Sequence, residues 1–361
     1  MMSMTWFKAT NKEAGVVSLF TAIFFTILLT VLTTGFIRIM INENQQANDD
    51  DFSSRAYYAA ESGVEDMKRA LAQYYPSDVS KLNATTCDPP VGYSNVVSSA
   101  LGVSYPCTLL NFNPPSIEAT LPGDGSSMQW RLRSQNDVPF NAIRISWHSL
   151  SDNVDGANVA FRTSNNIPRY SAWNSGGVPF PAMLRTTFFG YTTAGPVDEA
   201  DLKANNYAGF LNPTSTANGN AMDIIGAINN ATTPTDVLCT TNTATYNGYA
   251  CQTTINITSV GSFSGKTMYL RLKSLFDTNG TKVKIELMNG SNVVNSADAQ
   301  AIVDVTGRAG TLFRRVQSRV SLPGTATSDL MPEFGLESGD NICKRVELTD
   351  TTETLNGCVV R

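Results

Sequence analysis

EAGVVSLFTAIFFTILLTVLTTGFIRIMI, residues 13–41, carries no charged side chain between Glu13 and Arg38. Its apolar part, 16–37, would form an α-helix about 33 Å long. That length is enough to cross the hydrocarbon core of a bilayer, which is about 30 Å thick. The stretch therefore predicts one membrane-spanning helix.

The chain continues from this apolar stretch without a proline until Pro76. Residues 52–75, FSSRAYYAAESGVEDMKRALAQYY, place small and apolar residues at steps of three and four, which is typical of a helix with one buried face. These residues are Phe52, Ala56, Ala59, Gly63, Met67, Ala70 and Tyr74. Pro76 is the first residue that should end the helix. We expect one rod over 16–75, about 90 Å long, with its upper half packed on a globular head.

A membrane anchor with a helical spacer is the simplest interpretation of this pattern. Three details favour another one. A short leader with Lys8 and Lys12 precedes the apolar run, and Gly15 lies at its boundary. No A-x-A cleavage site of an ordinary removable signal follows the run. The run also leads into an amphipathic helix, where an anchor usually gives way to a flexible linker.

In these features the chain resembles the type IV pilin-like proteins, and most closely the PilX-like minor pilins. The basic leader ending in Gly15, the apolar helix after it and AYYAAESGVEDMKRAL (residues 56–71) carry the resemblance. The resemblance implies that a prepilin peptidase cuts between Gly15 and Val16. It also implies that the helix packs against other pilins in a filament. The residues expected in that packing are Phe20, Phe52, Ala56, Ala59, Ala60, Glu61 and Gly63.

One position departs from the family pattern. Family members of the filament shaft usually carry Glu as the fifth mature residue, where it pairs with a neighbour's terminal amine. This chain has Phe20 there. A buried amine without a partner is costly, so the departure argues against a bulk shaft subunit and favours a tip or initiation subunit.

Composition agrees with a β-rich extracellular head. Charged residues make up 16% of the chain, below the usual ~25%. The net charge of −5, together with the lack of a Lys/Arg block in the head, predicts no specific nucleic-acid binding. We expect no cofactor and no metal, since the chain has one histidine and no C-x-x-C pair.

Six cysteines lie beyond the helix, on its non-cytoplasmic side by the positive-inside rule. They form three sequence-local pairs: Cys87 with Cys107, Cys239 with Cys251, and Cys343 with Cys358. Three disulfides in an oxidising compartment are expected, although six cysteines allow fifteen pairings.

Alternating apolar residues predict strands over 127–135, 142–150, 181–191, 252–260, 266–276 and 282–290. The Asn-Gly pair at 279–280 predicts a hairpin between the last two. A final hairpin is expected over 299–324 around a turn at Gly307–Gly310. We expect 205–247 to form long loops with a short helix at Met222–Asn229.

Catalytic and ligand sites find little support. His148, beside Trp147, is expected to be an exposed histidine on a strand, and no G-x-S-x-G motif supports a triad. Asp152, Asn153 and Asp155 lack the spacing of a calcium loop. The aromatic residues between Trp147 and Trp173, which include Phe161 and Tyr170, leave open a sugar-binding surface.

We therefore predict an α+β protein with a long N-terminal helix packed on a large, mostly antiparallel β-rich head. The expected parts are a leader (1–15), the pilin helix (16–75), the head (76–323) and a disulfide-pinned tail (324–361). The expected function is a non-enzymatic minor subunit of a pilus-like filament, located first in the cytoplasmic membrane and then at the cell surface. Its partners would be other pilins, the prepilin peptidase, the inner-membrane assembly platform and a host or surface ligand. The alternative is a single-pass anchored surface domain that binds or hydrolyses carbohydrate.

Overall fold

The computed structural model describes residues 12–123, 125–149, 181–192, 206–214, 221–223, 235–240, 243–257, 266–277 and 279–322. The chain divides into two compact units. Unit 1 contains Met1–Asn111 and Ile302–Val320, and unit 2 contains Phe112–Ala301 and Ser321–Arg361. Unit 2 is thus inserted in the sequence between two segments of unit 1.

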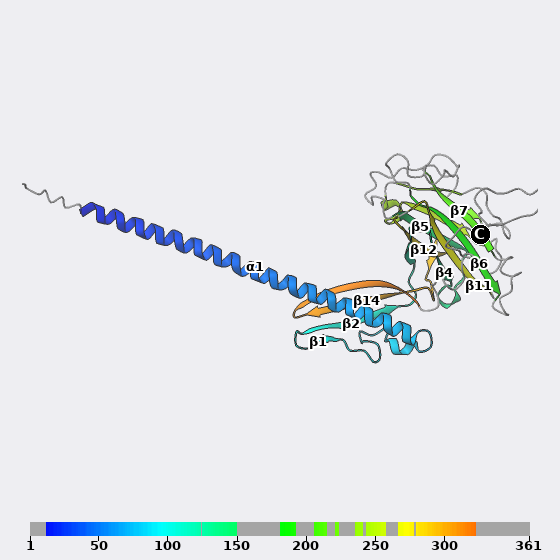
Figure 1. The fold of residues 1–361 in the computed structure, drawn as a ribbon, viewed down its shortest axis with the longest axis horizontal. Helices are drawn as coiled ribbons and strands as arrows, with labels where there is room; N and C mark the ends of the chain where they lie inside the picture. The colour runs from blue at the N-terminus through cyan, green and yellow to red at the C-terminus, as the bar shows by residue number, and fades with distance from the viewer. Residues whose placement is uncertain are drawn as a thin grey trace, which may run out of the picture. The chain divides into compact units, whose positions relative to one another are not determined.

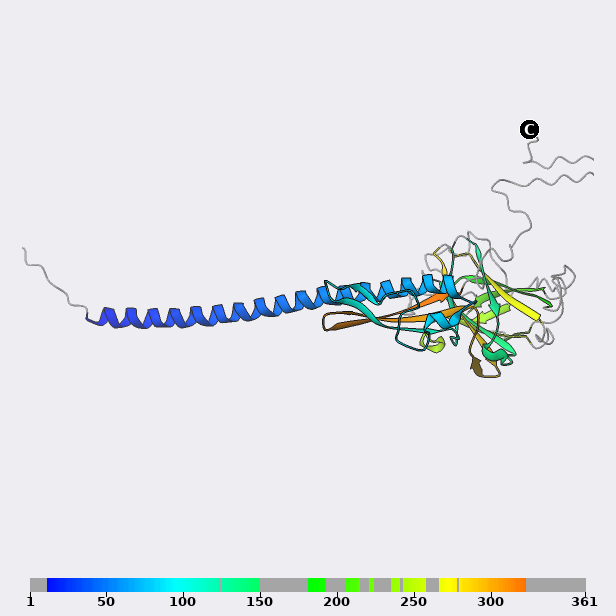
Figure 2. The same ribbon diagram turned by 90° about the horizontal axis from the view of Figure 1, so that it is seen from below.

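Unit 1 is built on one helix, α1 (Lys12–Tyr74), which runs without interruption for 63 residues (Figures 1 and 2). This confirms the predicted continuous rod. The helix ends before Pro76 as expected, with the amide of Tyr75 bonded to the Leu71 carbonyl. A short 3-10 turn, η1 (Val79–Leu82), follows and buries Leu82.

A four-stranded sheet completes unit 1, in the order β1-β2-β14-β15. Its strands are β1 (Val96–Ser98), β2 (Val103–Asn111), β14 (Gln300–Ala309) and β15 (Leu312–Ser321). The antiparallel pairing of β2 with β14 aligns Leu110 with Val303 and Cys107 with Thr306. The sheet thus joins the segment directly after the helix to a segment almost two hundred residues further along the chain.

Unit 2 contains two more sheets. One has the order β13-β12-β5-β10-β8, with β3 also paired to β12, and the other has the order β4-β11-β6-β7-β9. The strands are β3 (Ile117–Leu121), β4 (Ser127–Leu132), β5 (Ala142–Ser149), β6 (Met183–Thr192), β7 (Asn206–Thr214), β8 (Ala221–Asp223), β9 (Thr235–Leu238), β10 (Cys251–Asn256), β11 (Lys266–Leu275), β12 (Thr281–Asn289) and β13 (Asn292–Val294). The short 3-10 turns are η2 (Gln135–Asp137) and η3 (Thr243–Tyr246). Only the β10–β8 and β7–β9 pairs are parallel among the strand pairs with a described register.

The two sheets of unit 2 share one apolar core. Trp147 and Ile145 on β5 belong to the same buried cluster as Trp130 on β4 and Leu270 on β11. Side chains at alternate positions of each strand therefore point into a common layer, as in a β-sandwich. The predicted α+β class, with a helix packed on a mostly antiparallel β-rich region, is confirmed.

The hairpin predicted at the Asn-Gly pair is wrong. β11 and β12 are consecutive in sequence but belong to different sheets, so 277–280 is a connection between the two layers. The Asp277 carboxylate accepts hydrogen bonds from the Asn279 amide at 2.9 Å and from the Thr281 hydroxyl at 2.7 Å. Gly280 has a φ of +98°. These features are compatible both with a hairpin turn and with a corner between sheets. The strand pairing shows that it is a corner, because β11 pairs with β4 and β6 whereas β12 pairs with β5 and β13.

The prediction of long loops over 205–247 is also wrong in part. β7 and β9 lie in this range and pair with each other in parallel, from Leu211 opposite Thr235. A helix was predicted at Met222–Asn229, but Met222 belongs to strand β8 and pairs with Ile255 of β10. The rest of that predicted helix lies outside the described residues.

Candidate functional site

The apolar half of α1 is the first candidate site. Every described side chain from Val17 to Asp51 is exposed, and the helix is long and apolar enough to cross a membrane. Its threonine hydroxyls donate to carbonyls one turn earlier, as Thr21 does to Val17 at 2.8 Å and Thr34 to Thr30 at 2.7 Å. Hydroxyls satisfied in this way can lie in an apolar environment at little cost.

The positions implied in processing and subunit pairing lie on this half. Gly15 and Val16 are within α1. Phe20 is 69% exposed, so its ring is available to lipid or to another helix. The Phe24 ring, one turn further on, is 63% exposed.

The upper half of α1 packs on the sheet of unit 1 through small side chains. Ala56, Ala59 and Ala60 are at most 1% exposed. A Cβ atom on Gly63 would lie 2.7 Å from Val305 Cγ1, and one on Gly307 would lie 1.9 Å from the Ala56 carbonyl oxygen. The helix and the sheet approach so closely because neither glycine has a side chain.

A polar contact adds to this packing. The Tyr105 hydroxyl of β2 lies 2.8 Å from Asp66 Oδ2 on α1 and 2.6 Å from the Ser94 carbonyl oxygen. Burial raises the pKa of Tyr105, and the neighbouring Asp66 carboxylate raises it further. The hydroxyl therefore stays protonated and holds the helix, the strand and the loop before β1 together.

The structure divides the residues expected to pack against other subunits into two groups. Ala56, Ala59, Ala60 and Gly63 are covered by the chain's own sheet, and Phe52 packs beside them. Phe20 is exposed. The predicted apolar stripe is therefore real, but its upper part forms an intramolecular contact.

In the upper half of α1, the face turned away from the sheet remains exposed and could contact a partner. Tyr57 and Tyr58 are 45% and 64% exposed, and their rings meet edge to face with centroids 5.8 Å apart. Glu61 accepts a hydrogen bond from Tyr57 and raises its pKa. Exposed tyrosines are common in protein interfaces, where one end of the ring stays hydrated.

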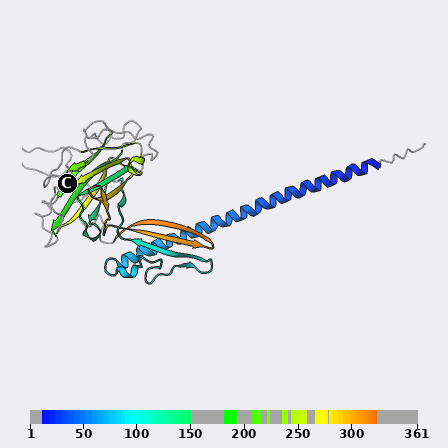
Figure 3. The ribbon, with the colours of Figure 1, turned by 180° about the vertical axis from the view of Figure 1, so that it is seen from behind.

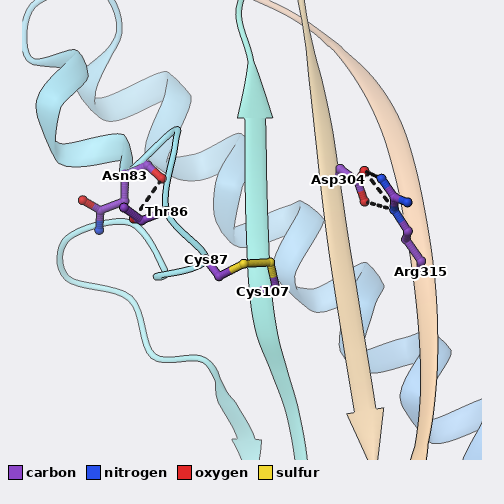
Figure 4. The surroundings of a disulfide bond; sticks show 6 residues. All are labelled: Asn83, Thr86, Cys87, Cys107, Asp304 and Arg315. Atoms are coloured by element: carbon purple, nitrogen blue, oxygen red, sulfur yellow. Dashed lines mark hydrogen bonds and ion pairs between the residues drawn. A yellow bond between two sulfur atoms is a disulfide. The ribbon is translucent and has the colours of Figure 1, made fainter.

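Two of the three expected disulfides are present. Cys87 bonds to Cys107 and fastens the loop after α1 to β2 (Figure 4). Cys239 bonds to Cys251 beside an isolated bridge between the same residues. Cys343 and Cys358 lie outside the described residues.

The predicted exposure of His148 is wrong. The side chain is only 8% exposed, and its ring lies 5.3 Å from that of Tyr249, centroid to centroid. Burial lowers the pKa of His148, and the Lys282 ammonium opposite it on β12 lowers it further. The alternation of side chains along β5 correctly predicted that His148 and Trp147 lie on opposite faces. The sequence did not predict that the Tyr249 ring packs against His148.

The remaining candidate ligand sites gain no support. Trp147 is fully buried and donates its indole N–H to the Ala182 carbonyl at 2.8 Å, so it belongs to the core. The other residues proposed for a sugar surface (Phe161, Tyr170 and Trp173) and for a calcium loop (Asp152, Asn153 and Asp155) lie outside the described residues. Within the described part of the chain, no group of three metal-ligating side chains is present.

The final hairpin predicted over 299–324 is confirmed as β14–β15, although Gly307 lies within β14 and not in the turn. The cluster of arginines near the turn was not predicted. Arg308, Arg314 and Arg315 are all exposed near its turn, together with Phe313, which is 55% exposed. Arg315 is neutralised by Asp304 of the neighbouring strand (Figure 4). A hairpin brings together charges that are six or seven residues apart in sequence, so no basic run marks the cluster.

No family model matches the chain, and no curated protein matches it at a significant level of similarity.

Proposed function

We propose that this chain is a minor subunit of a type IV pilus-like filament, located at the tip or at the point of initiation. The helix would join a bundle of other subunit helices, and the β-rich region would be displayed outward. In this role the chain is structural and adhesive and performs no catalysis.

The observation that carries the proposal is that the two halves of α1 differ in their surroundings. One uninterrupted helix is exposed and apolar in its first half and tightly packed on a sheet in its second. An ordinary anchor needs only the first half. A continuous helix of about 90 Å, which includes both the membrane-spanning segment and the segment packed on unit 1, is useful where the helix must keep its register against neighbouring helices.

The tip position is supported by Phe20 and by the size of the β-rich region. Phe20 cannot neutralise a neighbour's terminal amine, so stacking of this subunit along a shaft is disfavoured. A subunit at the end of a filament has no subunit above it, and a large head is accommodated there without crowding.

The test combines processing and location. We expect the mature protein to begin at Val16, and we expect Gly15→Val to leave the leader attached, as measured by mass spectrometry of the membrane fraction. Immunogold labelling of sheared filaments should find the protein at filament ends.

Gly35→Val is the matched control, because Gly35 lies in the same apolar helix and has no atom within 4 Å of its Cβ position. That variant should be processed normally. A mature wild-type protein with another N-terminus, or filaments that never carry label, would refute the filament function.

A further inference from the structure

We propose that the turn region of the β14–β15 hairpin docks on the acidic segment Asp49–Asp51 of a second copy of this chain, offset along the helix axis. The inference rests on the proposed function, because it requires helices that stand side by side, here those of two copies at the end of the filament. It names the contact that this subunit makes above the membrane.

The basic partner in this contact is the hairpin end that faces the N-terminal half of α1 (Figures 1 and 3). Two cations there have no carboxylate partner among the described residues. Arg308 donates to the Gly310 carbonyl at 2.9 Å and lies over the Phe313 ring. Arg314 donates to the Ser53 hydroxyl at 2.7 Å. Both arginine side chains are exposed.

The acidic partner is a collar of three consecutive carboxylates on the exposed helix. Asp51 pairs with Arg55 at 2.8 Å, whereas Asp49 and Asp50 form no ion pair within the part of the chain that the structure describes. Consecutive helical residues point about 100° apart. The carboxylates of Asp49 and Asp50 therefore point in directions about 100° apart around the helix.

The relative heights of the two partners set the offset. A Cβ atom on Gly310 would lie 3.8 Å from the Phe52 ring, so the hairpin turn lies at the level of Phe52. The collar begins three residues earlier, which corresponds to about 5 Å along the helix. Two parallel copies displaced by roughly 5–10 Å would bring the hairpin of one to the collar of the other.

Charge distribution favours a second copy over a polyanion or an anionic membrane. The collar lies directly beside the hairpin in the same molecule, and its carboxylates would repel phosphate or sulfate polymers. A second copy offers the same pair of opposite charges and can satisfy both. The exposed ring of Phe313 and that of Tyr57, one turn beyond Ser53 on α1, would add apolar area to the contact.

The first test is zero-length cross-linking of the full chain in detergent micelles. An equal mixture of ¹⁴N- and ¹⁵N-labelled R308K/R314K protein is treated with a carbodiimide, which joins lysine amines to carboxylates. We expect cross-linked peptides between position 308 or 314 and Asp49–Asp50 that combine both isotopes. Cross-links within one isotope only, or none at all, would overturn the proposal.

The second test is exchange of charges. R308E/R314E and D49K/D50K should each weaken self-association about tenfold in sedimentation experiments, and a mixture of the two should recover it. Rising salt should weaken the wild-type association. D88K is a matched control, because Asp88 is an exposed acid beyond the end of α1. Association that is unchanged in the two charge variants would refute the contact.

These outcomes are separable from those of the filament function. Self-association without label on filaments would refute only the filament role, whereas labelled filaments without isotope-mixed cross-links would refute only this contact.

Discussion

Gly307 of β14 lies directly against the backbone of Ala56, because a Cβ atom at Gly307 would be 1.9 Å from the Ala56 carbonyl oxygen and 2.5 Å from the Ala60 nitrogen. Both obstacles are backbone atoms of a helix, so neither can turn aside as a flexible side chain would. The contact fixes how closely the sheet of unit 1 approaches α1.

Replacing this glycine should therefore loosen unit 1. We expect Gly307→Ala to destabilise it by about 3 kcal/mol, at the upper end of the cost of overpacking. Thermal unfolding of the full chain in detergent would show a lower Tm for unit 1. Trypsin would cut faster after Arg55 and Lys68, whose helical segment loses its support.

Gly35→Ala is the control for this substitution, because Gly35 is in the same helix but has open space around it. Its Tm should equal that of the wild type. If Gly307→Ala also melted like the wild type, the close approach of strand and helix would not contribute to stability.

The Cys87–Cys107 disulfide should stabilise unit 1 independently of that approach. It closes a loop with a sequence separation of 20 residues, which the chain-entropy model values at about 3 kcal/mol. We expect the double variant Cys87→Ser/Cys107→Ser to melt at a lower temperature. Reducing agent should lower the Tm of unit 1 in the wild type and leave the Tm of the variant unchanged.

Peptide mapping without reduction checks the pairing itself. We expect the Cys87–Cys107 and Cys239–Cys251 peptides, and the prediction also includes Cys343–Cys358. A free thiol in the native protein would contradict the prediction of three local pairs.

His148 should make unit 2 sensitive to mild acid. Its pKa is lowered in the folded state by burial and by Lys282, so the unfolded chain binds the proton more readily. Stability from the neutral ring is complete above the unfolded pKa, about 6.5, and declines as the pH falls below that value. We expect the Tm of unit 2 to fall between pH 7 and pH 5.

Because His148 is the only histidine in the chain, one substitution isolates its effect. His148→Gln should flatten the pH dependence in this window, although the replacement of a buried ring lowers stability at every pH. Glu286 acts at lower pH. Burial tends to raise its pKa, but hydrogen bonds from Arg144 and Lys284 outweigh burial and lower it. A pH profile in His148→Gln that matches the wild type would refute the assignment.

Local signals in the sequence predicted the parts of the fold that depend on local structure. The helix could be predicted because its apolar residues recur every three or four positions over a long distance and Pro76 marks its end. Strands such as β4 and β5 could be predicted because apolar residues occupy alternate positions along them. Two of the three expected sequence-local disulfides are present.

What sequence missed depends on pairing between distant segments. The Asn-Gly turn at 279–280 could not reveal that β11 and β12 belong to different layers. Gly307 was expected in a turn, yet it lies inside β14. A glycine is needed there because the backbone of Ala56 on the helix leaves no room for a side chain. The cover of His148 and the basic end of the β14–β15 hairpin likewise arise from contacts that no run of residues records.

The last prediction concerns Phe20, which tests the position in the filament. In the resemblance to pilins, a carboxylate at this position would neutralise the terminal amine of a neighbouring subunit. The wild-type phenyl ring is 69% exposed and offers no such group. We expect Phe20→Glu to be tolerated in filaments and to raise the number of labels along the shaft, because a buried ion pair replaces an amine with no partner.

Phe24→Glu provides the matched control, since Phe24 lies one turn further along the same face and is 63% exposed. A carboxylate at Phe24 enters the same apolar layer without a terminal amine at its level, so its cost is not offset. We expect that variant to be lost from filaments. Immunogold counts per unit length of sheared filaments, with wild type, Phe20→Glu and Phe24→Glu at equal expression, decide between the alternatives. Even labelling of the wild type along the shaft would place the protein in the shaft, and equal loss of both variants would mean that position 20 has no ion-pairing role.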